Sequence, residues 1–164
     1  MLDEVLRWYA DGTYYPNQCN DDSTVLRLDL GATSMLLIAD AEAGPRDAVD
    51  AAADELEGEF LTHRLADLDV DILQVAHHGS STSSRQVFLD AVTPRYALLS
   101  AGPTLNNGGV SFPDSEVVDA LLATGAELLR TDEHDNGCPK RDRIGMDDAA
   151  PGGCENYVLE IAAR

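Results

Sequence analysis

Short apolar segments alternate with polar turns along the chain, and their periodicity predicts a mixed α/β fold. Residues 24–30 alternate leucine with charged side chains, as a half-buried strand does, whereas residues 34–39 are mostly apolar, as in a buried strand. The intervening Gly31-Ala32-Thr33 predicts a turn, so we expect the two strands to form a hairpin. Further strands are expected at residues 70–76, 96–100, 127–131 and 157–161.

In the other segments, apolar residues recur at intervals of three and four, which predicts amphipathic helices. One of these helices should begin near Pro45, and Asp114 is placed to cap another that stops at Gly125. Residues 132–153 are polar and rich in Gly and Asp, which predicts a long surface loop. No linker or internal repeat interrupts the chain, so residues 1–164 should form a single domain. The helices are expected at residues 2–9, 45–60, 85–92 and 115–124.

The composition fits a soluble globular domain with an unusual charge. The chain has 164 residues, of which 44% are hydrophobic, enough for one substantial core. Asp and Glu number 30 against 11 Lys and Arg, a formal net charge of −19, so nucleic-acid binding should be weak unless metal ions intervene. No apolar segment approaches membrane-spanning length. We therefore expect a soluble protein, either cytoplasmic or exported without a visible signal peptide.

The three cysteines, Cys19, Cys138 and Cys154, form no Cys-x-x-Cys pair, which excludes a zinc ribbon. Cys138 and Cys154 both lie in glycine-rich sequence. They could close a loop in an oxidising compartment, and they could equally remain free thiols. The sequence leaves both alternatives open.

The candidate chemistry lies where two predicted strands end. His77 and His78 directly follow the strand at residues 70–76, and Asp40 directly follows the strand at residues 34–39. In open α/β sheets ligands are held at the carboxyl ends of strands, so these imidazoles are candidate metal ligands or proton-transfer groups. A carboxylate such as Asp40 can bridge two cations, although Asp also commonly caps helices. We expect Asp40 and His77 to meet at one sheet edge, close enough to hold one cation.

Five segments together resemble a known family, the metallo-β-lactamase-like hydrolase domain of ComEC-type DNA-uptake proteins and its stand-alone relatives. The resemblance covers roughly residues 17–133. It implies an αββα sandwich whose edge binds two divalent ions, commonly zinc or manganese, and cleaves phosphodiester bonds. The segments are Asn20-Asp21-Asp22-Ser23, Ile38-Ala39-Asp40-Ala41-Glu42, Val75-Ala76-His77-His78-Gly79-Ser80, Thr93-Pro94-Arg95-Tyr96 and Leu129-Arg130-Thr131-Asp132.

The resemblance also implies roles for individual residues. Asp40 matches the bridging carboxylate and His77 a terminal ligand, while its neighbour His78 is either an alternative ligand or a supporting group. Ser80 should steady the histidine loop by bonding its backbone. The predicted catalytic and metal-binding residues are Asp40, His77 and His78, with Asn20, Ser23, Ser80 and Asp114 around them.

Two departures from the family pattern reduce the predicted ligand set. The His-x-x-x-Asp-His cluster expected upstream of Asn20 does not occur, and residues 112–117 read Phe-Pro-Asp-Ser-Glu-Val instead of His-Pro-His-Pro-Glu-Val. Asp114 could ligate a metal or act as a base there, but helix capping is its commoner role. A catalytic zinc usually takes three protein ligands and a water. The expected fold is therefore a sandwich that lacks much of its N-terminal half, with the metal retained or lost.

Three hypotheses follow from this incomplete site. The chain could be a metal-dependent phosphodiesterase whose missing ligands come from a longer chain or from a complementing N-terminal half. It could be a non-catalytic binding or structural module that has kept only the fold. It could also be a half-domain that forms a homodimer to bury an exposed sheet face.

Overall fold

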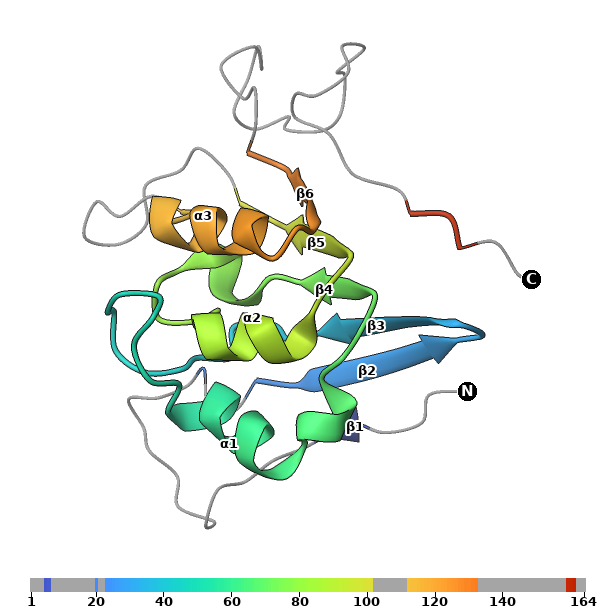
Figure 1. Ribbon diagram of the computed structural model, residues 1–164, viewed down its shortest axis with the longest axis horizontal. Helices are drawn as coiled ribbons and strands as arrows, with labels where there is room; N and C mark the ends of the chain where they lie inside the picture. Colours follow the sequence, from blue (N-terminus) through green and yellow to red (C-terminus); the bar gives the residue numbers. More distant parts are fainter. Residues whose placement is uncertain (1–4, 7–19, 21–22, 102–111, 133–158, 162–164) are drawn as a thin grey trace.

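The described residues of this computed structural model, 5–6, 20, 23–101, 112–132 and 159–161, form one mixed sheet with helices on one face (Figure 1). The sheet has six strands whose spatial order follows the chain. β1 to β3 are antiparallel neighbours, and β3 to β6 are parallel. The strands are β1 (Val5–Leu6), β2 (Val25–Leu30), β3 (Thr33–Leu37), β4 (Ile72–Gln74), β5 (Tyr96–Leu99) and β6 (Glu127–Arg130).

The predicted hairpin is confirmed. β2 and β3 pair with Leu26 opposite Leu37 and Leu30 opposite Thr33, and Gly31 turns the chain with a φ of 65° that glycine adopts without strain. The strands expected from residues 70–76, 96–100 and 127–131 are also present, as β4, β5 and β6. Parallel pairing from β3 to β6 brings the carboxyl ends of β3, β4 and β5 to the same edge of the sheet.

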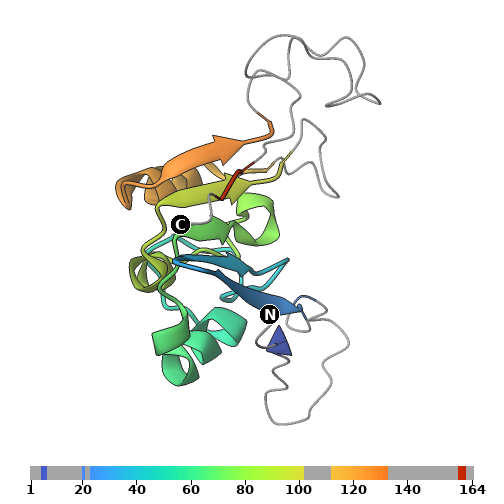
Figure 2. The same ribbon diagram turned by 90° about the vertical axis from the view of Figure 1, so that its right-hand side faces the viewer.

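Three described α-helices, α1 (Glu55–His63), α2 (Gln86–Val92) and α3 (Ser115–Ala123), cover one face of the sheet, as the side view in Figure 2 shows. None of the described helices is long and apolar enough to span a membrane. Two 3-10 turns, η2 (Leu65–Asp67) and η3 (Ala76–Gly79), connect the elements. The core between helices and sheet includes Leu36, Leu73, Leu99, Phe88, Leu89, Val117 and Leu121.

The α/β class is therefore confirmed, but the αββα sandwich stays a prediction. Within the part of the chain that the structure describes there is one sheet, and the second sheet of a sandwich is not among these residues. The polar loop expected at residues 132–153 lies outside the described residues except for Asp132. The same is true of Cys19, Cys138 and Cys154.

Three expected elements differ from the structure. Val5–Leu6 is a strand rather than part of a helix, because pairing with Leu26 and Val25 satisfies the backbone of the sheet's outer strand. The helix expected from residue 45 begins only at Glu55. The carbonyls of Pro45 and Asp47 accept hydrogen bonds from Arg85 instead of from helical N–H groups, and Arg85 shares the Ala48 carbonyl with the Ala51 N–H of a single turn. The strand expected at residues 157–161 is not formed by residues 159–161.

A buried ionic cluster fixes the segment that precedes α1. The Arg85 side chain is only 1% exposed and donates to four backbone carbonyls at 2.7–3.0 Å, those of Pro45, Asp47, Ala48 and Ser81. Glu57, on α1, is fully buried and accepts the backbone N–H groups of Ser84 and Arg85. Burial raises the pKa of Glu57 to about 7, and those two N–H groups and the Arg85 charge oppose this rise only in part.

The first prediction concerns Glu57→Gln. Burial raises the folded-state pKa of Glu57 from 4.5 to about 7. The Glu57 carboxylate therefore binds a proton more tightly in the folded protein than in the unfolded chain. The resulting stabilisation is complete below pH 4.5 and is lost as the pH rises through 7, a change of about 3 kcal/mol. Urea unfolding across this pH range should show that fall in the wild type and not in Glu57→Gln.

Glu116→Gln, which removes an exposed carboxylate from α3, is the matched control and should keep the wild-type pH profile. Parallel profiles for the wild type and Glu57→Gln would contradict the raised pKa.

Candidate functional site

Backbone strain marks the point where β3 and β4 end. Ala39, His77 and His78 have φ values of 52°, 45° and 56°, in the left-handed region that non-glycine residues rarely adopt. The His77 N–H donates to the Ala39 carbonyl at 3.0 Å, so this hydrogen bond joins the strained residues after the two strands. Such conformations cost roughly 1–3 kcal/mol each and are concentrated at functional sites. The strain therefore supports a functional interpretation of this edge.

Glu42 and Thr82 fix the orientation of the His77 ring. Its Nδ1 lies 2.9 Å from Glu42 Oε1 and 3.0 Å from Thr82 Oγ1. The Thr82 hydroxyl donates to Ser80 Oγ, and a carboxylate only accepts, so the shared proton belongs to His77 Nδ1. In the neutral ring this leaves the lone pair on Nε2, the nitrogen that a metal or a substrate proton would use.

His78 has the same tautomer for a different reason. Its Nδ1 lies 2.7 Å from the Ser100 carbonyl, which only accepts, so Nδ1 carries the proton. Its Nε2 lies 3.9 Å from Asp40 Oδ1. Both side chains are about half exposed, at 52% and 49%, and are therefore open to solutes.

The structure pairs the predicted residues differently from the expectation. Asp40 lies beside His78 rather than His77, and His77 pairs with Glu42, a residue that was not predicted. Asn20 contributes through Glu42, to which its Nδ2 donates at 3.1 Å. Ser23 is joined to Asn20 through a backbone hydrogen bond of 3.0 Å.

Ser80 bonds the backbone of the histidine loop, as expected, and also contacts the side chain of Arg46. Its Oγ accepts the Thr82 N–H at 3.3 Å and the Thr82 hydroxyl at 3.0 Å, which steadies the loop after the histidines. It also receives Arg46 Nη1 at 3.3 Å. Ser80 therefore links the surroundings of His77 to a cation that was not predicted.

Asp114 occupies the N-cap position of α3, but its side chain makes no capping hydrogen bond, so the expected capping role is wrong. Its Oδ2 accepts the Ser81 N–H at 2.7 Å, and its Oδ1 accepts Arg46 Nη2 at 2.5 Å. The carboxylate is drawn toward the histidine loop because a guanidinium and a free N–H lie there.

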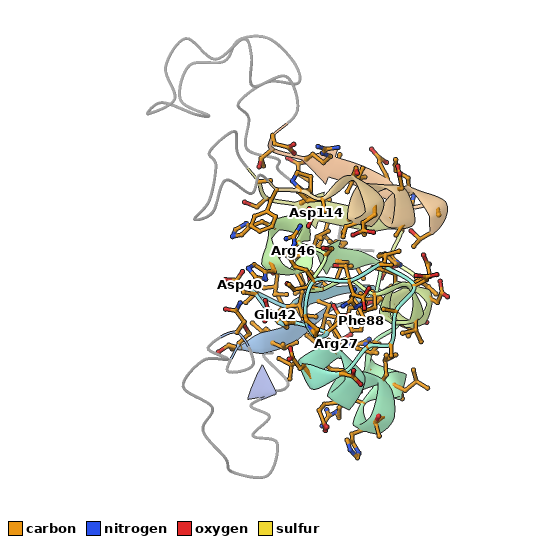
Figure 3. The ribbon with its side chains drawn as sticks, turned by 90° about the vertical axis from the view of Figure 1, so that its left-hand side faces the viewer. Arg27, Asp40, Glu42, Arg46, Phe88 and Asp114 are labelled. Atoms are coloured by element: carbon orange, nitrogen blue, oxygen red, sulfur yellow. The ribbon has the colours of Figure 1, made fainter. Side chains whose placement is uncertain are left out.

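Gly79 allows the segment around Asp114 to approach the histidines. A Cβ at residue 79 would meet the Pro113 Cβ at 2.7 Å, and the Gly79 carbonyl accepts the Asp114 N–H at 2.9 Å. This approach places the Phe112 ring 5.7 Å from the His77 ring, between centroids. In Figure 3, Asp114, Arg46, Asp40 and Glu42 follow one another across this end of the sheet.

The missed residues are Glu42, Arg46 and Thr82. Glu42 could have been found, because it follows Asp40 by two residues in the same segment after a strand. Arg46 is the one basic residue among residues 40–54, which is a weaker signal. Thr82 is one of several hydroxyl residues in a row, and nothing in the sequence distinguishes it.

The described residues meet part of what a divalent cation requires. Imidazole nitrogen and carboxylate oxygen are suitable donors for zinc or manganese. The separation of 3.9 Å between His78 Nε2 and Asp40 Oδ1 is near the roughly 3.4 Å expected for two ligands about 2.1 Å from one tetrahedral ion. However, no group of three or more His, Cys, Asp or Glu suited to a metal occurs among the described residues. The pair formed by Asp40 and His78 is therefore one short of the three protein ligands that a catalytic zinc takes.

Comparison with known proteins supports part of the resemblance. No family model matches the sequence. The chain is 34% identical over 135 residues to competence protein ComA of Neisseria gonorrhoeae, an alignment that covers 77% of the chain and 18% of that protein. It is 29% identical over 120 residues to ComE operon protein 3 of Bacillus subtilis, covering 73% of the chain and 13% of that protein.

Recombination protein 2 of Haemophilus influenzae is 36% identical over 83 residues, covering 51% of the chain and 9% of that protein. The chain thus spans less than a fifth of the length of these curated relatives. Its homologues are competence proteins, which supports the resemblance to ComEC-type DNA-uptake proteins. The metallo-β-lactamase-like part of the resemblance stays a prediction.

The second prediction is that neutral His77 and His78 both carry their proton on Nδ1, the less common tautomer of free histidine. The acceptors at Nδ1, Glu42 and the Ser100 carbonyl, enforce it. Long-range ¹H–¹⁵N NMR spectra at alkaline pH should identify this tautomer for both rings. His63 provides an internal control, because its Nε2 is the nitrogen that faces Glu59, at 3.5 Å. Protonated Nε2 on His77 and His78 would contradict the assignment.

Proposed function

We propose that this chain is a domain of a DNA-uptake protein that binds a divalent cation with Asp40 and His78 and there binds and hydrolyses phosphodiesters. The observation that carries the proposal is the orientation of the two imidazoles. Each ring has its Nδ1 engaged by an acceptor, so each offers Nε2 as a ligand, and that of His78 already faces a half-exposed carboxylate.

The negative charge of the chain means that DNA phosphates would need a bound cation to approach it closely. At a formal net charge of −19 the protein repels the phosphates of DNA. A bound divalent cation would supply local positive charge and polarise a phosphoryl oxygen. Asp40 and His78 would hold it, while Glu42 keeps the His77 ring oriented beside it. The competence proteins among the relatives supply the biological context of DNA uptake.

A second candidate function is association through the open face of the sheet. Strand register places a set of eight apolar residues on the face opposite the helices, which they share with Gln74 and Glu127, and none of the eight belongs to the helix-covered core. In Figure 2 no described helix lies over this face. We propose that two copies of the chain bury it against each other. The set comprises Leu26, Leu28, Met35, Leu37, Ile72, Tyr96, Leu98 and Leu129.

The third prediction tests the cation. Mn²⁺ binding, measured by electron paramagnetic resonance and calorimetry, should weaken about tenfold or more in Asp40→Ala and in His78→Ala, because each removes one of two protein ligands. Glu42→Gln should leave Mn²⁺ affinity near the wild-type value, because Glu42 contacts His77, which is not one of the two proposed ligands. Hydrolysis of bis-p-nitrophenyl phosphate should depend on added Mn²⁺ or Zn²⁺ and disappear in the same two alanine variants.

The matched controls are Asp119→Ala and His63→Ala, which remove an exposed carboxylate and an exposed imidazole from helices away from this edge. Absence of Mn²⁺ binding would refute the proposed function for this chain. Binding without turnover would refute the hydrolytic part and favour the non-catalytic binding module.

The fourth prediction tests the open face. Light scattering should show a mass that rises with protein concentration for the wild type and stays at one chain for Leu28→Lys, because a charge on the buried face opposes association. Leu122→Lys, at a leucine that is 54% exposed on α3, should behave as the wild type. A wild-type mass of one chain at high concentration would exclude the dimer.

A further inference from the structure

Arg46 places an exposed positive charge next to the candidate site. Its side chain is 43% exposed, and its Nη groups contact Asp114 Oδ1 at 2.5 Å and Ser80 Oγ at 3.3 Å. A guanidinium carries five N–H donors, so three of them have no acceptor among the described residues. These donors are available to an anion that arrives from solvent.

The position of Arg46 connects it with His77. The guanidinium carbon lies 5.8 Å from the centroid of the Phe112 ring, and the His77 ring lies 5.7 Å from the same ring. Ser80 provides a second link, because its Oγ accepts from both Arg46 and the Thr82 hydroxyl that contacts His77 Nδ1. Arg46, Phe112 and His77 therefore form one continuous surface, which we call the Arg46 surface.

A purely structural role explains Arg46 poorly. Asp114 is already held by the Ser81 N–H through its other oxygen, at 2.7 Å, so it does not need Arg46 to stay in place. Ion pairs with an exposed partner typically contribute little to stability. Within residues 40–54, Arg46 is surrounded by five acidic residues, so an incoming phosphate would meet positive charge in this segment only there.

We propose that the Arg46 surface binds a phosphate of single-stranded DNA, with the guanidinium on the phosphate and the Phe112 ring against the adjacent unpaired base. Arginine forks match phosphate oxygens, and aromatic rings stack on unpaired bases of any sequence. Asp114 accepts from one Nη group of Arg46 in the free protein, so the phosphate binds the remaining donors and competes with Asp114 for that group. The inference rests on the proposed function in that both assign a phosphodiester ligand to this edge, but it concerns different residues.

The fifth prediction uses fluorescence anisotropy of a labelled oligothymidylate of about 12 nucleotides, in the presence of Mn²⁺. Arg46→Gln should lower the affinity about tenfold, and Arg46→Lys less, because lysine keeps the charge and loses the fork. Asp114→Asn should raise the affinity a few-fold, because asparagine can still accept the Ser81 N–H but competes less for Arg46. The salt dependence of binding should lose about 0.7 of a unit of slope in Arg46→Gln.

Arg95→Gln is the matched control. Arg95 also lies over an aromatic ring, 5.2 Å from the centroid of Tyr96, but it precedes β5 and so lies at the opposite end of the strands. Arg95→Gln changes the net charge by the same amount as Arg46→Gln. It should leave the DNA affinity and the salt dependence of DNA binding near the wild-type values. Duplex DNA of the same sequence should bind more weakly, because its bases are not free to stack.

The outcomes separate the two proposals. Wild-type DNA affinity in Arg46→Gln, or equal losses in Arg46→Gln and Arg95→Gln, would overturn the Arg46 surface whatever Mn²⁺ does. Reduced affinity in Asp114→Asn would overturn the competition between Asp114 and phosphate. If Mn²⁺ does not bind the wild type but Arg46→Gln alone weakens DNA binding, the proposed cation site fails and the Arg46 surface stands.

Discussion

The buried guanidinium of Arg85 is the interaction on which the candidate site depends. It is enclosed by backbone carbonyls from two segments, residues 45–48 and Ser81, that are far apart in sequence. A charge removed from water must be compensated by hydrogen bonds, and here the carbonyl dipoles of both segments provide them. Residues 45–48 include Arg46 and continue the loop that begins with Asp40 and Glu42, and Ser81 belongs to the loop that begins with the histidines. Arg85 therefore turns two irregular loops into one supported surface.

This support explains how the strand ends can tolerate a strained backbone. Left-handed conformations at Ala39, His77 and His78 together cost several kcal/mol, a substantial fraction of the 5–15 kcal/mol by which domains are usually stable. Glycine would remove this cost at each position. Glu55 and Thr93 have similar φ values away from the site, so the strain supports a use for the imidazoles only together with the fixed orientation of their rings. Hydrogen bonds from both rings to fixed acceptors provide that orientation and select one tautomer.

Periodicity predicted most of the sheet because each strand is defined by its own residues. The hairpin of β2 and β3 and the apolar run of β4 follow from local alternation and length. The late start of α1 could not be predicted, since a residue forty positions away, Arg85, takes the carbonyls of the expected first turns. Likewise, strand ends correctly located Asp40 and His77, but which carboxylate meets which imidazole depends on the left-handed turn at His77 and His78. Spacing contains no information on that turn.

Two surfaces of opposite character result from this arrangement, and they do not compete. The polar surface lies at the carboxyl ends of the strands, where Asp40 and His78 could bind a cation and Arg46 could bind a phosphate. The apolar surface lies on the open face of the sheet, perpendicular to that edge, where its eight members share the face with Gln74 and Glu127. In so acidic a chain, phosphate can approach only where positive charge is supplied, while association needs only the apolar face. Ligand binding at the edge and association through the face can therefore occur in the same molecule.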